Sequence, residues 1–104
     1  MYTIGVDVGG TYTDLVASDE SGRTVFARSP STPADQSLGV MAGLDELARR
    51  LGVTRGQMLA ETERLVALLK ASGADVTLAW QFAGHQLTAG DIEQAKTWLS
   101  AVRV

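Results

Sequence analysis

The sequence contains no cysteine and a single histidine, and these scarcities exclude several kinds of chemistry. Without cysteine there can be no disulfide, no thiolate nucleophile and no cysteine-based zinc site, and nothing favours an oxidising compartment. No apolar run approaches the roughly 20 residues that a membrane helix needs, and the amino terminus lacks a signal peptide's basic and apolar regions. We therefore expect a cytoplasmic protein without a membrane partner.

Basic residues are also few, with 9 lysines and arginines against 12 acids and a formal charge of -3. They form no basic run, so the positive surface that nucleic-acid binding requires is missing and we exclude DNA and RNA partners. The 104 residues predict a single domain over residues 1–104, too small for two lobes that close around a nucleotide.

Alternating apolar residues open the chain and predict three antiparallel strands. Residues 3–8 and 11–17 form a predicted hairpin around Gly9-Gly10, and residues 24–28 form a third strand. For the glycine pair alone, a tight turn that uses positive φ explains both residues. A fourth strand is predicted over residues 75–80. Because helices precede it, we expect this strand to pair in parallel with the first strand, in the order 3-2-1-4.

Capping signals predict three helices. The first begins at Thr32-Pro33 and ends at Gly52, and the second runs from Thr54 to Ser72, although its apolar face thins between residues 59 and 65. The third follows Thr88. The expected fold class is α/β, with a small mixed sheet and three helices.

The most informative motif is residues 7–14, which read Asp-Val-Gly-Gly-Thr-Tyr-Thr-Asp. This hairpin, with residues 31–33 and 39–44, resembles the amino-terminal segment of the hydantoinase A/5-oxoprolinase family, in the actin-like ATPase superfamily. The resemblance covers residues 2 to about 65 and implies an actin-like or ribonuclease-H-like half-fold. It also implies phosphate contacts from the hairpin and a metal-binding acid at Asp7. The implied phosphate-binding residues are Gly9, Gly10, Thr11 and Thr13.

Residues from about 64 to 100 resemble a different family, the phospholipase/carboxylesterase branch of the α/β-hydrolases. The residues that carry this resemblance are 65–80, the Gly84-His85-Gln86 loop and 95–99. The resemblance implies that His85 corresponds to a catalytic base. The sequence has no Gly-x-Ser-x-Gly nucleophile motif and no acid segment, so a serine-esterase triad cannot be assembled. An intact ATPase site is not expected either.

Together the two resemblances predict a chimera with a junction near residues 61–66. A natural fusion, a laboratory recombinant and an accidental library junction would all leave this pattern.

If the strand at 75–80 lies beside the first strand, Asp7 and His85 meet at one edge of the sheet. Asp7, Asp14 and His85 are then candidate ligands of a divalent metal ion, with Asp7 and His85 as candidate catalytic residues. The resulting hypothesis is a weak metal-assisted hydrolase of small activated phosphoesters or esters. The alternatives are a folded recombinant fragment without activity and a phosphate- or nucleotide-binding remnant.

Self-association is the last expectation from the sequence. A small sheet presents unpaired backbone groups along its outermost strands, and a 104-residue chain buries only a modest core. Pairing between copies would satisfy these groups, so we expect a homodimer or a higher homo-oligomer.

Overall fold

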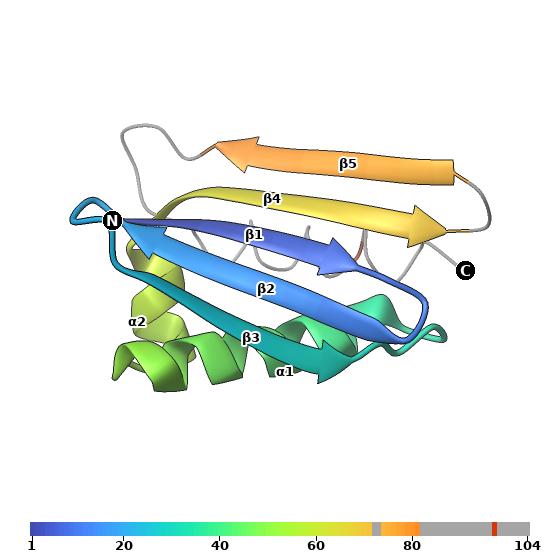
Figure 1. Cartoon of the computed structure of the whole chain (residues 1–104), viewed down its shortest axis with the longest axis horizontal. Helices are drawn as coiled ribbons and strands as arrows, with labels where there is room; N and C mark the ends of the chain where they lie inside the picture. Colours follow the sequence, from blue (N-terminus) through green and yellow to red (C-terminus); the bar gives the residue numbers. More distant parts are fainter. Residues whose placement is uncertain (72–73, 82–96, 98–104) are drawn as a thin grey trace.

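The structure, a computed structural model, describes residues 1–71, 74–81 and 97. A mixed five-stranded sheet is packed on one face by two helices, α1 and α2 (Figure 1). In chain order the elements are β1 (Tyr2–Val8), β2 (Tyr12–Asp19), β3 (Thr24–Pro30), α1 (Gln36–Leu51), α2 (Arg55–Ala60), β4 (Thr62–Ala71) and β5 (Ala74–Gln81). No helix in the described part of the chain is long and apolar enough to span a membrane.

The three opening strands form the antiparallel sheet expected from their alternation. Every second residue of β1 is buried, beginning at Ile4, and the buried residues of β2 follow the same period from Thr13. β2 lies between β1 and β3 and pairs antiparallel with both. The α/β class and the order 3-2-1-4 are therefore confirmed, and β5 extends the sheet beyond β4.

The strand that lies beside β1 is not the one expected. β4 occupies that position and pairs in parallel with β1, whereas residues 75–80 belong to β5, which pairs antiparallel with β4. The expectation that residues 75–80 run beside the first strand is therefore wrong. A fifth strand accounts for the difference, because residues 62–71, which the sequence predicts as helix, take the position beside β1.

The second helix is much shorter than its sequence predicts. α2 ends at Ala60, with Glu61 as its C-cap, and the Thr62 hydroxyl donates to the Met58 carbonyl at 2.8 Å. Residues 62–71 have good helix formers among them, but the edge of β1 offers a full ladder of backbone hydrogen bonds. Tertiary context therefore overrides propensity. The described part contains two helices where three were expected for the whole chain, and the helix predicted after Thr88 lies outside it, apart from Thr97.

α1 begins four residues after the predicted cap. Asp35, not Thr32, is the N-cap, and its side chain accepts from the Ser37 amide. Thr32 holds the first turn differently, since its hydroxyl donates to the Asp35 carbonyl at 2.6 Å and accepts from the Gly39 amide at 2.8 Å. The predicted end at Gly52 is confirmed, with φ 80° in the left-handed region.

The core lies between the sheet and the helices. It is made of aliphatic side chains from β1, β2 and β3 on one side and from α1 and α2 on the other, with Ala67 added by β4. Ile4, Val8, Leu47 and Met58 are among the residues that are fully buried. This arrangement leaves the hairpin between β1 and β2 at one end of the sheet, close to where α1 begins (Figure 1).

Candidate functional site

The tip of the β1–β2 hairpin is closed by one backbone hydrogen bond, from the Gly9 amide to the Tyr12 carbonyl at 3.0 Å. Neither Gly9 nor Gly10 has a positive φ, so the tight-turn explanation from positive φ is wrong. Gly9 is explained by close approach, because a Cβ there would lie 3.0 Å from the Tyr12 carbonyl oxygen. A Cβ on Gly10 would meet nothing within 4 Å, so the fold itself gives no reason for this glycine.

Ser31, which follows β3, holds the hairpin at three points. Its amide donates to the Thr11 carbonyl at 2.9 Å, and its hydroxyl donates to the Gly9 carbonyl at 2.6 Å. The Thr13 hydroxyl lies 3.0 Å from the Ser31 hydroxyl. Since the one Ser31 hydroxyl hydrogen is used on Gly9, Thr13 is the donor in this last contact. Sequence reasoning included Ser31 in the family resemblance but assigned it no role.

The two threonines of the hairpin have different surroundings. Thr13 is fully buried on the face that packs against α1, and its hydroxyl is engaged with Ser31. Thr11 is exposed at the tip, next to Gly10. Of the four predicted phosphate-binding residues, Gly10 and Thr11 are therefore exposed to an incoming ligand, while Gly9 is half-buried.

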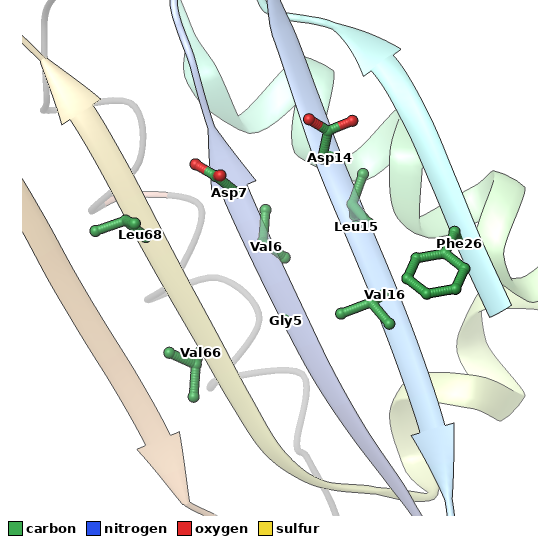
Figure 2. Close-up of a pocket in the computed structure, with 9 residues that line it drawn as sticks. All are labelled: Gly5, Val6, Asp7, Asp14, Leu15, Val16, Phe26, Val66 and Leu68. Carbon is green, nitrogen blue, oxygen red and sulfur yellow. The ribbon is translucent and has the colours of Figure 1, made fainter. Parts of the chain in front are cut away.

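Asp7 and Asp14 lie on the outer face of the sheet, the face turned away from α1 (Figure 2). They are directly opposite each other in the β1–β2 register. Opposed residues of an antiparallel pair have Cβ atoms about 4.5–5.5 Å apart, and two like charges in this position repel. The structure therefore brings these two predicted metal ligands together.

Arg28 on β3 offsets part of this repulsion. It lies opposite Asp14 and binds its carboxylate through two nitrogens, at 2.7 Å and 3.4 Å. The hydrogen bond that Arg28 donates to Asp14 raises the pKa of the Arg28 guanidinium, which also stacks 4.8 Å from the centre of the Tyr12 ring. The Asp14 carboxylate is therefore already engaged by a charge-assisted pair of hydrogen bonds.

A shallow apolar groove of about 350 Å³ runs along the same outer face, beside the two carboxylates (Figure 2). Phe26 and Val16 lie on its β3 side and Val66 and Leu68 on its β4 side, with Gly5 between them. The absence of a side chain at Gly5 is what hollows the sheet surface here. The groove ends at Asp7 and Asp14.

Of the predicted metal ligands, Asp7 and Asp14 lie on the sheet and His85 lies outside the described residues. Within the described ranges no group of three or more His, Cys, Asp or Glu side chains could hold a metal ion. Two opposed carboxylates do fit Mg²⁺, which commonly binds to one or two protein carboxylates together with phosphate oxygens and water. The donor chemistry of Asp7 and Asp14 therefore suits a metal ion that arrives with a phosphate ligand.

Three of the amides at the start of α1 are already satisfied within the fold. The Ser37 amide is capped by Asp35, the Leu38 amide donates to the Asp35 carbonyl at 3.2 Å, and the Gly39 amide is satisfied by Thr32. Amide groups at a helix start attract anions when they are free. Here they are used within the fold, which leaves the β1–β2 hairpin as the candidate site.

Comparison with known proteins identifies the family of this chain. The family model described as "Hydantoinase/oxoprolinase N-terminal region" matches residues 3–99. The chain belongs to this family. The first predicted resemblance is thereby confirmed, and the match extends across residues 61–66, where a junction was predicted.

Two named relatives are similar over much of the chain. The alpha subunit of caprolactamase from Pseudomonas jessenii is 35% identical over 85 residues, which cover 74% of this chain and 12% of that protein. The beta subunit of acetone carboxylase from Xanthobacter autotrophicus is 32% identical over 60 residues, or 58% of this chain and 8% of that protein. The chain thus spans about a tenth of the length of these relatives.

A solved structure supports the same relationship. It is the nucleotide-free structure of acetone carboxylase, an enzyme of ATP-dependent acetone carboxylation, and it matches with a TM-score of 0.64 and 30% identity. The match covers 66% of this chain and 10% of that one.

A shorter similarity links part of this chain to a protein of another name. MhqD of Bacillus subtilis (strain 168), which carries the name of a hydrolase, is 47% identical over 38 residues, or 36% of this chain and 19% of that protein. The predicted esterase-like segment is not established by this match, and it stays a prediction.

Proposed function

We propose that this chain is a phosphate-binding module whose β1–β2 hairpin takes up the phosphates of a nucleotide. Gly10 carries the proposal, because its backbone is exposed and unobstructed and its lack of a side chain has no other explanation in the fold. A missing Cβ allows close approach of a ligand to the backbone. The related acetone carboxylase acts in an ATP-dependent carboxylation, which supports a nucleotide as the source of the phosphates.

Each residue of the site has a part in this proposal. The exposed Thr11 hydroxyl and the Gly10 backbone contact phosphate oxygens, and Gly9 keeps the hairpin closed through its bond to Tyr12. Asp7 and Asp14, which lie opposite each other in the β1–β2 register, hold a divalent metal ion. Such an ion would neutralise phosphate charge when bound. Thr13 is buried and does not contact the phosphate itself, and it supports the hairpin through its hydrogen bond to Ser31.

Calorimetric titration of the 104-residue chain with ATP in the presence of Mg²⁺, and separately with inorganic phosphate, tests the proposal. Gly10→Ala should weaken binding of both probes, by about tenfold if one close backbone contact is lost. Gly56→Ala is the matched control, because a Cβ at Gly56 is also free of close contacts, with only the Thr54 hydroxyl at 3.9 Å. Equal affinity of the two variants, or no binding of either probe at millimolar concentration, would contradict the proposal.

Asp7 can be tested in the same titrations. Asp7→Asn should not weaken the binding of inorganic phosphate without metal, because it removes a negative charge, and it should reduce the gain in ATP affinity that Mg²⁺ confers. If Mg²⁺ strengthens ATP binding equally in both proteins, Asp7 does not serve the metal.

The similarity to MhqD favours a second candidate function, a weak metal-assisted hydrolase with Asp7 and His85 as candidate catalytic residues. The expectation that the two meet at one edge of the sheet loses its ground, because β5 runs antiparallel to β4 and Gln81 at its end lies opposite Arg64, not beside Asp7. A chimera of two segments joined near residues 61–66 would underlie this candidate, but the family model runs through that junction. Hydrolysis of activated phosphate and carboxylate esters should then depend on a divalent ion and decline in His85→Ala and in Asp7→Ala. A rate that neither substitution changes would eliminate this candidate and leave a binding module, or a folded fragment without activity.

A further inference from the structure

The hydrogen bonds around Ser31 suggest a role beyond the folding of the chain. Its amide and its hydroxyl bind two carbonyls, those of Thr11 and Gly9, that lie on either side of Gly10. Its hydroxyl also accepts a hydrogen bond from the Thr13 hydroxyl. These three contacts, here called the hairpin clasp, fix the backbone before and after the residue that is proposed to meet the phosphate. The turn has one further backbone bond, between Gly9 and Tyr12.

The clasp is continuous with α1 through the residues on either side of Ser31. The Ser29 hydroxyl donates to the Gly39 carbonyl at 2.6 Å, and Thr32 accepts from the Gly39 amide. Gly39 itself fits closely, since a Cβ there would lie 2.8 Å from the Pro30 carbonyl oxygen. The segment from Ser29 to Thr32 is therefore anchored to the helix at two points, and Ser31 connects this anchored segment to the hairpin.

We propose that Ser31 is a positioning residue that holds the β1–β2 hairpin in its phosphate-binding shape. The proposal rests on the proposed function and adds a residue that need not touch the ligand. Two physical facts support it. The Ser31 hydroxyl both donates and accepts, so its removal in Ser31→Ala leaves the Gly9 carbonyl and the Thr13 hydroxyl without this partner. Preorganised donors at a binding site cost no reorganisation when the ligand arrives.

The test compares Ser31→Ala with Ser29→Ala in the full chain. Both substitutions remove a serine hydroxyl that donates to a backbone carbonyl at 2.6 Å, but Ser29 binds α1 and Ser31 binds the hairpin. The effect of losing one hydroxyl-to-carbonyl bond is therefore matched, while Ser31→Ala also removes the acceptor of the Thr13 hydroxyl. Ser31→Thr, which keeps a hydroxyl at the same position, serves as the conservative rescue.

Two measurements are made on each protein. The affinity for ATP with Mg²⁺ and for inorganic phosphate should decrease by about fivefold in Ser31→Ala, the equivalent of one hydrogen bond, and by much less in Ser29→Ala and Ser31→Thr. Hydrogen exchange of the Gly9 amide, which donates to Tyr12, should accelerate in Ser31→Ala alone. Exchange reports the shape of the hairpin with no ligand present.

The outcomes separate the two proposals. If the unaltered protein binds neither probe, the proposed function fails, while the exchange rates still decide whether Ser31 controls the hairpin. Equal losses of affinity in Ser31→Ala and Ser29→Ala would overturn the positioning role. So would an unchanged exchange rate of the Gly9 amide in Ser31→Ala.

Discussion

Among individual residues, Gln36 is the one whose burial is hardest to explain by the fold. It is the first residue of α1 and is 1% exposed, and neither polar atom of its side-chain amide has a hydrogen-bond partner among the described residues. Burying an amide without a partner costs about 1–3 kcal/mol. An apolar side chain of similar length should therefore fit this position better.

We expect Gln36→Met to raise the free energy of unfolding by about 1 kcal/mol, since it removes an unsatisfied amide while nearly conserving volume. Gln36→Glu, of the same shape but charged, should lower it. Urea denaturation monitored by circular dichroism measures both changes. A loss of stability in Gln36→Met would show that the amide has a partner that matters.

Thr13 shows what the sequence could predict at the scale of a residue. The family resemblance assigns it to the phosphate site. In β2, however, it lies on the same face of the strand as Leu15 and Ala17, which are both buried. Strand alternation alone places Thr13 inward, and the structure confirms that position. Its bond to Ser31 could not be foreseen, because the two residues are 18 positions apart and meet only when β3 returns beside β2.

At the scale of elements, the largest error was the prediction of a helix over the residues that form β4, and this error has a physical cause. Residues 62–71 read as helix by composition, and only the thin apolar face from Glu61 to Arg64 indicated a break. That break is where α2 ends and β4 begins. The preference of these residues for a strand comes from their pairing with β1, which is distant in sequence, so local patterns cannot show it. The caps at Thr54 and Gly52 are local and were predicted correctly.

The contact between α1 and the sheet depends on two glycines spaced four residues apart, Gly39 and Gly43. A methyl group on Gly39 would press on the Pro30 backbone, and one on Gly43 would overlap the end of the Leu15 side chain. Glycine inside a helix costs about 1 kcal/mol relative to alanine, so both positions give up helix stability for close packing.

We predict that Gly39→Ala and Gly43→Ala each lower the free energy of unfolding by about 1–3 kcal/mol, the usual cost of overpacking. In a Leu15→Val background the Gly43→Ala cost should shrink, because the overlapping side-chain atoms are gone, while the Gly39→Ala cost should persist against rigid backbone. Thermal denaturation of the single and double variants measures the coupling. Equal costs of Gly43→Ala in both backgrounds would refute the proposed contact.

At the scale of the whole molecule, the sheet order was predictable because the chain closes its first three strands locally and then crosses back to β1. A right-handed crossover through helices permits few other arrangements. The site was predictable in part. Asp7 and Asp14 were expected near each other and are opposed in the register, whereas the partnership of Asp14 with Arg28 requires knowing that β3 pairs with β2.

The exposed edge at β3 supports the expected self-association. Within the described part of the chain β3 pairs only with β2, and Phe26 on β3 is 64% exposed beside the apolar groove of the outer face. An unpaired strand next to an exposed aromatic side chain favours pairing with a second copy. We therefore predict a homodimer at micromolar concentration, which light scattering would detect as twice the mass of the chain.

Phe26→Glu should shift this dimer toward the monomer, because a charge would replace the apolar surface at the edge. Leu38→Glu is the matched control, since Leu38 is 62% exposed but lies on α1 and not on a strand of the sheet. Its mass should stay that of the dimer. A monomeric unaltered protein would contradict the prediction, and dissociation by Leu38→Glu alone would move the interface from the β3 edge to the helical face.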